Sequence, residues 1–310
     1  MMTLRASRHE KSKMGKDVSF QMMIKKIARV MCAVGATFAL AACGNGEPVA
    51  PHEITGTIDL VTRDEGSGTR AAFNEMLGIT QDGVDQTTLA AIVQNGTDQV
   101  MTLVATDPGA IGYISLGSLN DTVKPLNVDQ VEPTEENVLN GTYKLYRPFT
   151  VITNKARPLS EVSKDFLTFI QSKDGQAIVR DAGYVPIKAE QSYQAKGLSG
   201  NINISGSTSV GPVMESLAEA YQKLNPKVSI NITQNGSSAG IQAARQGSSD
   251  FGISSRQLTD AEQDLTETVI ANDGIVVIVN KENARNDITS AELQKIYLGK
   301  VSDWEELRAE

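Results

Sequence analysis

The chain has 310 residues, of which 40% are hydrophobic and 21% are charged, enough apolar material for one large domain or two smaller ones. Its formal net charge is −8, and without residues 1–42 it keeps 21 basic and 35 acidic residues, a net charge of −14. A surface of this sign argues against nucleic acid as a partner. It also requires that any bound anion be held by local hydrogen bonds.

The first part of the chain has the pattern of a lipoprotein leader. Three basic residues at positions 25–29 precede an apolar stretch at residues 30–40, which runs into the sequence LAAC at Cys43. A transmembrane anchor is the alternative, but the stretch is far shorter than the roughly 20 residues that a spanning helix needs. We therefore predict a signal peptide at residues 1–42, a lipid on Cys43 and a flexible tether over residues 43–54.

The rest of the chain alternates strand and helix patterns. Apolar runs and three-to-four spacing predict strands at residues 58–61, 110–115, 123–128, 147–153, 202–205, 228–232, 250–255 and 274–280, and helices at residues 71–77, 87–94, 97–106, 162–170, 175–180, 213–224 and 290–297, with a further helix that opens at residues 236–240. Residues 129–146 are polar and turn-rich, and the polar, aperiodic residues 191–200 are the best candidate for an internal linker. This alternation indicates an α/β fold with mostly parallel sheets.

Three turns rich in glycine, serine and threonine precede predicted helices, at residues 66–69, 206–209 and 236–238. Each turn by itself is explained by ordinary helix N-capping. A strand that ends in such a turn and enters a helix also directs backbone N–H groups, hydroxyls and the positive end of the helix dipole at one spot, which suits an oxyanion. Since Arg63 adds a guanidinium to the first turn, we predict that the first two turns face each other across one anion.

Enzymatic and metal chemistry lack the residues they need. The sequence GSSAG around Ser238 matches a nucleophile elbow, but the only histidines are His9, in the leader, and His52, in the tether. A serine–lysine arrangement stays open as an alternative. Cleavage before Cys43 would remove Cys32 and commit Cys43 to lipid, which leaves no thiol for a metal or a disulfide. The chain also has no P-loop or dinucleotide-binding motif, so we expect no enzyme, no metal and no cofactor.

Acidic residues accompany the turns. Asp64 and Glu65 flank Arg63, and Asp273 precedes the last predicted strand. Such carboxylates could orient an arginine or cap a turn. A carboxylate could also accept a hydrogen bond from a protonated oxyanion, which sulfate cannot donate. We favour the Arg-orienting role for Glu65 and leave both roles open for Asp273.

Longer motifs carry a resemblance to a known family. They are residues 206–212 (GSTSVGP), 236–240 (GSSAG), 250–256 (DFGISSR), 273–280 (DGIVVIVN), 63–69 (RDEGSGT), 108–115 (PGAIGYIS), 147–149 (RPF), 175–179 (GQAIV) and 183–186 (GYVP). Together they resemble the phosphate-binding proteins of high-affinity phosphate ABC transporters, over nearly all of residues 55–307.

The order of the motifs differs from that of the family, in which the GSTS turn comes first. This resemblance therefore implies a circular permutation, with new ends in the loop between residues 304–307 and 56–58 and the old ends joined through residues 191–200. Permutation is tolerated where the cut lies in an exposed loop and the old ends are close. A rearranged reading frame is the alternative.

The resemblance implies the type II periplasmic-binding-protein fold, an α/β fold of two lobes joined by two crossover strands with the ligand in the cleft between them. In this order, residues 55–147 and 279–310 form one lobe and residues 148–278 form the other. The crossover strands are then residues 149–153 and 275–280.

The family's phosphate ligands correspond to seven positions of this chain: Thr208, Ser209 and Ser237 in one lobe, and Arg63, Ser67, Gly68 and Thr69 in the other. Ser255 stands where members of the family often place an aspartate acceptor, and it could still bond phosphate through its hydroxyl. This difference makes Asp273 a candidate acceptor.

By resemblance, the protein binds inorganic phosphate and delivers it to the permease subunits of an ABC transporter. We expect a monomer without a cofactor, anchored through lipid at Cys43 to the outer face of the cell membrane or its periplasmic side. The alternative from another class is a phosphate or oxyanion sensor, or a surface interaction module, that uses the same fold without transport. A hydrolase with Ser238 as nucleophile is a third hypothesis.

Overall fold

The computed structural model describes residues 50–308, and residues from Pro51 onward form one unit. The predicted signal peptide, the lipid site at Cys43 and most of the predicted tether lie outside the described residues. Within residues 50–308, no helix is both long enough and apolar enough to cross a membrane.

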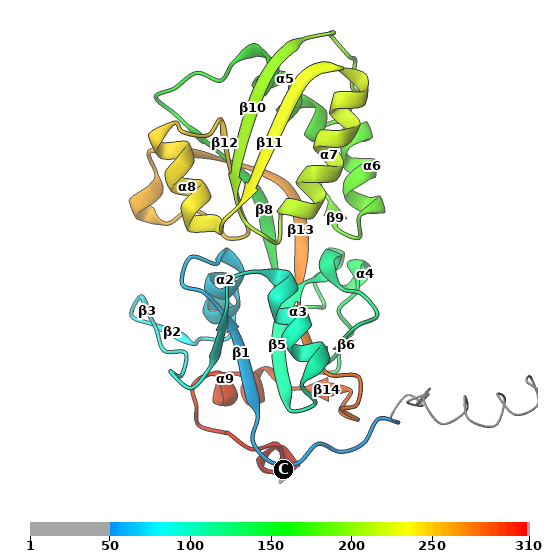
Figure 1. Ribbon diagram of the computed structural model, residues 1–310, viewed down its shortest axis with the longest axis vertical. Coiled ribbons are helices and arrows are strands. Elements are labelled where there is room, and N and C mark those ends of the chain that lie inside the picture. The colour runs from blue at the N-terminus through cyan, green and yellow to red at the C-terminus, as the bar shows by residue number, and fades with distance from the viewer. Residues whose placement is uncertain (1–49, 309–310) are drawn as a thin grey trace, which may run out of the picture. The chain divides into compact units, whose positions relative to one another are not determined.

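A ten-stranded mixed sheet runs through this unit, with β8 and β13 at its centre (Figure 1). The strand order is β11-β10-β12-β8-β13-β5-β1-β4, and β6 and β9 attach to β13. The strands are β1 (Asp59–Arg63), β4 (Ile92–Gln94), β5 (Ala110–Ser115), β6 (Lys124–Pro125), β8 (Tyr146–Asn154), β9 (Val185–Pro186), β10 (Ser199–Gly206), β11 (Lys227–Gln234), β12 (Phe251–Ser254) and β13 (Leu265–Val279). The α/β prediction is confirmed. The parallel arrangement holds only in the flanks, where β1 pairs with β4 and β5 and β10 pairs with β11 and β12, because the central strands β8 and β13 are antiparallel.

The remaining elements gather around the two ends of the sheet (Figure 1). The group that we call the β1 half contains α2 (Gly68–Met76), β2 (Thr80–Gln81), β3 (Val84–Asp85), α3 (Thr97–Thr106), η1 (Leu116–Ser118), β7 (Asn127–Val128), α4 (Glu135–Leu139), β14 (Asp287–Ile288), α9 (Ser290–Tyr297) and η3 (Trp304–Arg308). The group that we call the β10 half contains α5 (Glu161–Ile170), α6 (Lys173–Asp181), α7 (Gly211–Leu224), α8 (Ser237–Gln246) and η2 (Asp260–Glu262).

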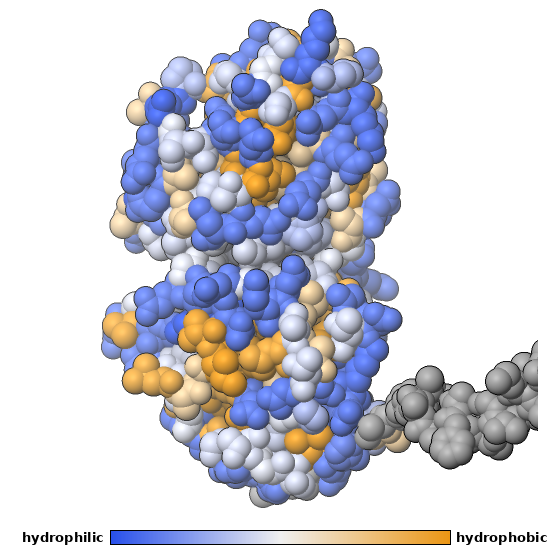
Figure 2. Space-filling view, viewed as in Figure 1, coloured by the Kyte–Doolittle hydropathy of each residue, from blue (hydrophilic) through white to orange (hydrophobic). Residues whose placement is uncertain are grey.

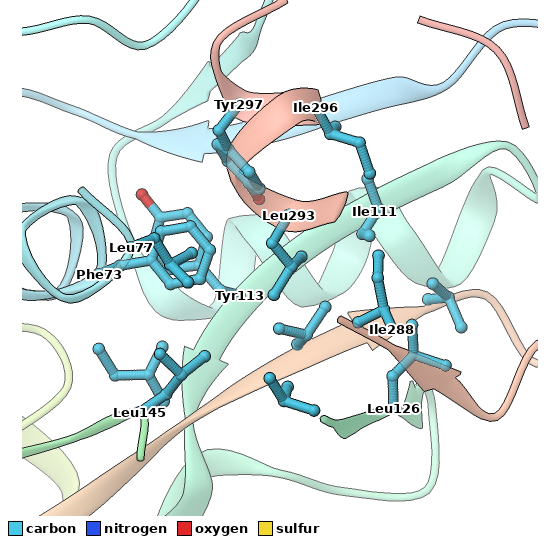
Figure 3. Close-up of a cluster of buried hydrophobic side chains, with 14 of the residues drawn as sticks. Phe73, Leu77, Ile111, Tyr113, Leu126, Leu145, Ile288, Leu293, Ile296 and Tyr297 are labelled. Carbon is cyan, nitrogen blue, oxygen red and sulfur yellow. The ribbon is translucent and has the colours of Figure 1, made fainter. Parts of the chain in front are cut away.

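An aromatic core positions the end of β1. In Figure 3, Phe73 of α2, Tyr113 of β5 and Tyr297 of α9 lie together among aliphatic side chains. The rings of Phe73 and Tyr113 stack with centroids 4.1 Å apart, and the Tyr297 ring meets Phe73 edge-on at 4.9 Å. The Tyr297 hydroxyl donates to the Val61 carbonyl oxygen at 3.0 Å, and the backbone N–H of Arg63 donates to the Tyr113 hydroxyl at 3.3 Å. The core therefore fixes the strand end from which Arg63 projects.

The β10 half has its own core, in which α5 packs against α7. The Phe166 ring of α5 lies 4.9 Å from the Tyr221 ring of α7. Tyr193, from the predicted linker, meets the Phe169 ring edge-on at 5.1 Å and donates through its hydroxyl to the buried carboxylate of Asp165. The linker segment before β10 is thus irregular, as predicted, and it is anchored to the core through Tyr193.

The residues of the two cores show where the central strands β8 and β13 pass from one half to the other. Leu145 and Ile275 pack in the core of the β1 half, whereas Phe149 and Ala271 pack in the core of the β10 half. Strand β8 thus crosses near residue 147, where we expected a boundary. Strand β13 passes from one core to the other between Ala271 and Ile275. The lobe boundary at residues 278–279 stays a prediction.

The helix predicted at residues 87–94 is wrong. Its last three residues form β4, which pairs in parallel with β1 so that Val61 lies opposite Ile92. The spacing of the apolar residues suggested the buried face of a helix, but these side chains lie at the surface. Ile92 is 38% exposed, Val93 is 53% exposed and Leu89 is fully exposed. Figure 2 shows that hydrophobic residues reach the surface of the β1 half. A second difference is α4, a short helix capped by Thr134 inside the segment expected to be only turns.

The two ends of the described chain lie side by side. Thr57 pairs with Asp303 in an antiparallel bridge, and the backbone N–H of Trp304 donates to the Gly56 carbonyl oxygen at 3.0 Å. The Ile58 N–H also donates to the Ser302 carbonyl oxygen. Both ends therefore belong to the β1 half.

Candidate anion site

Arg63 ends β1, and its guanidinium reaches across to the β10 half. Its Nε donates to the carbonyl oxygen of Gln94, its register partner in β4, at 3.1 Å. Its Nη2 donates to the Asn95 carbonyl oxygen and to Thr208 Oγ1, both at 3.2 Å. Burial lowers the pKa of Arg63, and Asp64 partly opposes this. Because arginine stays protonated under such shifts, a fixed cation faces the second half.

The carboxylate that contacts Arg63 belongs to Asp64, whose Oδ1 lies 3.4 Å from Nη2. We had expected Glu65 in this role, but Glu65 is exposed. The turn after β1 directs the side chain of residue 64 back toward the guanidinium and leaves that of residue 65 in solvent. The Asp64 side chain is 30% exposed, so it compensates the charge of Arg63 only in part.

The turn after β1 leads into α2, and its residues have separate tasks. Ser67 is the N-cap, since its Oγ accepts a hydrogen bond from the Arg70 N–H at 3.3 Å. Ordinary capping therefore accounts for Ser67. It does not account for Thr69, whose Oγ1 lies 2.8 Å from Ser209 Oγ and 3.4 Å from Ser255 Oγ of the β10 half.

Three segments of the β10 half meet at the same place: the turn after β10, the start of α8 and the residue that follows β12. Ser207 Oγ accepts from the Ser209 N–H at 3.2 Å and donates to Ser255 Oγ at 3.0 Å. Ser237 Oγ accepts from the Ser255 N–H at 3.2 Å. The N-cap residues of α7 and α8 make no side-chain capping bond, and Ser207 and Ser237 bond both to backbone N–H groups and to a neighbouring hydroxyl.

We use the name hydroxyl cluster for seven side chains: Thr69, Thr97, Ser207, Thr208, Ser209, Ser237 and Ser255. Thr97 begins α3, and its Oγ1 lies 3.4 Å from both Thr208 Oγ1 and Ser209 Oγ. Every member except the half-buried Thr208 is at most 4% exposed. Buried hydroxyls are costly unless they are paired, and separations near 3.4 Å are long for a bond whose usual length is about 2.8 Å. Several contacts within the cluster are therefore weaker than ordinary hydrogen bonds.

The two halves approach most closely at Gly68. A Cβ atom placed on Gly68 would lie 2.4 Å from Ser237 Oγ and 2.8 Å from Ser255 Oγ, so no larger residue fits without displacing one half. The backbone contributes as well, since the Ser238 N–H donates to the Gly66 carbonyl oxygen at 3.1 Å. Gly236, the N-cap of α8, has φ of 97°, a conformation that favours glycine.

The chemistry of the site is that of an oxyanion receptor. Four helices, α2, α3, α7 and α8, begin at or next to the hydroxyl cluster and turn their positive ends toward it. The cluster adds hydroxyl donors, and Arg63 adds a guanidinium. A tetrahedral anion with several acceptor oxygens matches this set of donors.

Asp273, the candidate acceptor, is fully buried beside the cluster and is already engaged. Its Oδ2 lies 2.7 Å from Arg147 Nη1, and its Oδ1 accepts from Ser115 Oγ at 2.9 Å. Burial raises the pKa of Asp273 to about 6, against the lowering effects of Arg147 and Ser115. These contacts assign Asp273 to orienting Arg147, whose Nη2 donates to Thr69 Oγ1 at 3.1 Å.

The features of an enzyme are not assembled here. Ser238 lies in the first turn of α8, whereas His52 is exposed and bridges Asn283. Among residues 50–308, no group of three or more histidine, cysteine, aspartate or glutamate side chains could hold a metal ion.

The structure brings together most of the predicted site residues. Those that meet at the boundary are Arg63, Gly68, Thr69, Thr208, Ser209, Ser237 and Ser255, while Ser67 caps α2 in the same turn. Sequence reasoning missed Thr97, Ser207 and Arg147 as members of the site. Ser207 lies inside a motif that we had noted, and Thr97 opens a helix after a glycine, which is the signal used for the other turns. Arg147 also lies inside a noted motif, residues 147–149, but nothing in that motif indicated that its guanidinium would reach Thr69.

Comparison with known proteins gives one family for nearly the whole of this region. Residues 52–174 and 191–310 match the family described as the PBP superfamily domain. The gap in the match, residues 175–190, falls on most of α6 and on β9, and it ends just before the predicted linker.

The chain is also similar to named relatives. It is 46% identical over 275 residues to the phosphate-binding protein PstS 2 of Streptococcus agalactiae, a match that covers 86% of this chain and 92% of the relative. It is 43% identical over 294 residues to PstS 2 of Streptococcus pneumoniae, covering 93% and 100%. A crystal structure of a phosphate-binding protein of a phosphate ABC transporter from Streptococcus pneumoniae has a TM-score of 0.66 and 45% identity, covering 81% of this chain and all of that one.

Proposed function

Because the chain belongs to the PBP superfamily and to its phosphate-binding protein PstS family, we propose that it binds inorganic phosphate at the hydroxyl cluster and delivers it to an ABC permease. The observation that carries this proposal is the contact of Arg63 with Thr208 across the boundary between the halves. Both halves place hydrogen-bond donors there. The relatives carry the names of binding proteins, which agrees with the expectation that the chain is not an enzyme.

We propose that the two halves act as lobes that close around phosphate. Strands β8 and β13 are the central connections between them, so a change of angle at these strands would separate the cluster without unfolding either core. Ligand contacts made by both halves stabilise only the closed arrangement, and phosphate would therefore shift the population toward it. The proposed ligands are Arg63, Ser67, Gly68 and Thr69 from the β1 half, and Thr208, Ser209, Ser237 and Ser255 from the β10 half.

We also propose that the protein is held at the cell membrane by lipid on Cys43, after removal of residues 1–42. The described chain begins its pairing at His52, so only a short segment would separate the lipid from the fold. This places a monomeric binding protein on the outer face of the membrane, or on its periplasmic side, next to a permease. Radioactive palmitate labelling of the wild-type chain, with Cys43→Ser as the comparison, tests the anchor: label on both would refute it.

The circular permutation remains a proposal, and two observations support it. The beginning and the end of the described chain pair directly, as Thr57 does with Asp303, so a family member could be joined there. The matches extend over 92% and 100% of two streptococcal relatives, so a rearranged reading frame in this chain alone is not needed to explain the order. Phosphate binding by a variant reopened at residue 195, with the present ends joined by a short linker, would support the permutation, and failure of that variant to fold would count against it.

Calorimetric titration of the purified protein with phosphate and with sulfate tests binding. We expect phosphate to bind at micromolar concentrations or below, and we expect Arg63→Ala and Thr208→Ala each to weaken it, the former by about a hundredfold because it removes charge-assisted hydrogen bonds. Thr168→Ala is the matched control, because Thr168 is exposed on α5 and donates only within its own helix. Absence of phosphate binding by the wild type would end the proposal.

Phosphate uptake separates transport from sensing. Cells that lack the gene should recover high-affinity uptake with the wild-type chain and should not recover it with Arg63→Ala. Binding without any contribution to uptake would favour the alternative, a phosphate sensor or interaction module on the same fold.

A further inference from the structure

A buried ion pair lies where the central strands pass between the halves. Arg147 of β8 and Asp273 of β13 are register partners in the antiparallel ladder, and Nη1 lies 2.7 Å from Oδ2. Arg147 is 3% exposed and Asp273 is fully buried. Burying two charges costs desolvation free energy that their attraction offsets only in part. Stability alone therefore does not explain why an ion pair lies at this position.

The carboxylate is held from the β1 half. Asp273 Oδ1 accepts from Ser115 Oγ at 2.9 Å and from the Gly117 N–H at 3.4 Å, at the end of β5 and in η1. The guanidinium lies 5.2 Å over the ring of Phe149, which belongs to the core of the β10 half. Arg147 is therefore fixed by groups from both halves.

The remaining contact of Arg147 goes to the anion site. Its Nη2 donates to Thr69 Oγ1 at 3.1 Å. A guanidinium cannot accept a hydrogen bond, so the direction of this contact is fixed. A hydroxyl has one hydrogen, and that of Thr69 is consequently directed to Ser209, to Ser255 or to a ligand between them.

We propose that Arg147, held by Asp273, is a positioning residue that makes Thr69 an obligate hydrogen-bond donor toward the bound anion. This inference rests on the proposed function, since phosphate is the ligand that Thr69 would serve. It assigns different roles to the two arginines at the site. Arg63, with its partly exposed partner Asp64, supplies positive charge that is only partly compensated, whereas Arg147 is neutralised by Asp273 and supplies only direction.

A double-mutant cycle between Arg147 and Thr69 tests the inference, with the phosphate Kd as readout. Arg147→Met removes the donor at similar length, and Thr69→Val removes the hydroxyl at similar shape. We expect each single variant to weaken phosphate binding about tenfold to thirtyfold, and the double variant to bind like Thr69→Val alone, because the arginine acts through that hydroxyl. Arg157→Met, at an exposed arginine that donates to the Gln246 carbonyl oxygen, is the control.

Two outcomes would overturn the inference: wild-type affinity in Arg147→Met, or losses in the two single variants that multiply in the double variant, as a purely structural arginine would give. Because Arg147→Met leaves Asp273 as an unpaired buried charge and can fail to fold, the cycle is repeated with Arg147→Met and Asp273→Asn together, and circular dichroism monitors the fold. Failure of the wild type to bind phosphate is a different result, which contradicts the proposed function itself.

Discussion

Substitution of Gly68 by alanine should block closure of the site while leaving each half folded. Gly68 is the first residue of α2, where alanine is a good helix former and the backbone needs no positive φ. The added Cβ would lie 2.4 Å from Ser237 Oγ and 2.8 Å from Ser255 Oγ, against an ordinary contact of 3.4 Å or more. Ser237 and Ser255 are short, buried side chains, and their hydroxyls are held by the Ser255 N–H and by Ser207 Oγ, so the halves must separate by about 1 Å.

A separation of about 1 Å would break the hydrogen bonds that cross the boundary between the halves. Arg63 Nη2 to Thr208 Oγ1 is 3.2 Å, Thr69 Oγ1 to Ser209 Oγ is 2.8 Å, and a further 1 Å takes both beyond hydrogen-bonding distance. Two or three such bonds at about 1 kcal/mol each amount to about 2 to 3 kcal/mol, or roughly a 30-fold to 150-fold increase in the phosphate Kd.

Calorimetry and thermal unfolding of the same samples decide the matter. The Tm of Gly68→Ala without phosphate should stay near that of the wild type, while the rise in Tm on addition of phosphate should shrink with the lost affinity. Gly96→Ala is the matched control: it also lies at the start of a helix, but its Cβ would meet only the flexible, exposed side chain of Gln99. Unchanged phosphate affinity in Gly68→Ala would refute the account of the boundary as a close contact that ligand binding requires.

Three further predictions concern other parts of the molecule. Arg63→Lys keeps the charge but cannot span the three acceptors of the guanidinium, so calorimetry should find phosphate binding weakened at least about tenfold. The pKa of Glu262 is lowered to about 2, chiefly by its bonds with Arg256, so its stabilising effect is complete above pH 4.5 and is lost as the pH falls toward 2. Urea unfolding should find Glu262→Gln less stable by about 1 kcal/mol at pH 7, after allowance for solvent screening, and level with the wild type near pH 2. Tyr193→Phe removes a hydrogen bond to buried Asp165, so it should lower the free energy of unfolding by about 1 to 2 kcal/mol and leave phosphate affinity unchanged. A loss of phosphate affinity as large as the loss of stability would contradict this prediction.

The residues of the site could be predicted from local chemistry, because each of them ends a strand or begins a helix. Arg63 follows an apolar run, and Ser237 opens a helix after a glycine, so the expected strand–turn–helix units indicated where donors would collect. The residues themselves predicted that the first two turns face each other across one anion, whereas the assignment of the turns to two lobes came from the resemblance. The distances between their hydroxyls depend on the packing of the two halves and have no counterpart in the sequence.

The contacts that escaped prediction are those set by register between distant strands. Arg147 and Asp273 are 126 positions apart, and only the antiparallel pairing of β8 with β13 brings them together. Similarly, Ile92 has the spacing of a helix face but adds to the edge of the sheet beside β1, since pairing there satisfies the backbone of a short β-branched segment. In both places the local sequence does not determine the structure, and the pairing of strands that are distant in the sequence does.

The charge distribution explains why the site has to be built in this way. Beyond residues 1–42 the chain carries a net charge of −14, and its overall field repels a dianion that comes within about a Debye length, some 8 Å at physiological ionic strength, because salt screens the repulsion at longer range. Attraction must then come from groups at the site, of which Arg63 is the cation with the weaker counter-charge. A buried, oriented set of hydroxyl and N–H donors meets this need without adding net positive charge that would attract unrelated anions. The same reasoning explains Asp273. Its carboxylate neutralises the charge of Arg147, so that the contribution of Arg147 to the site is to orient the hydroxyl of Thr69.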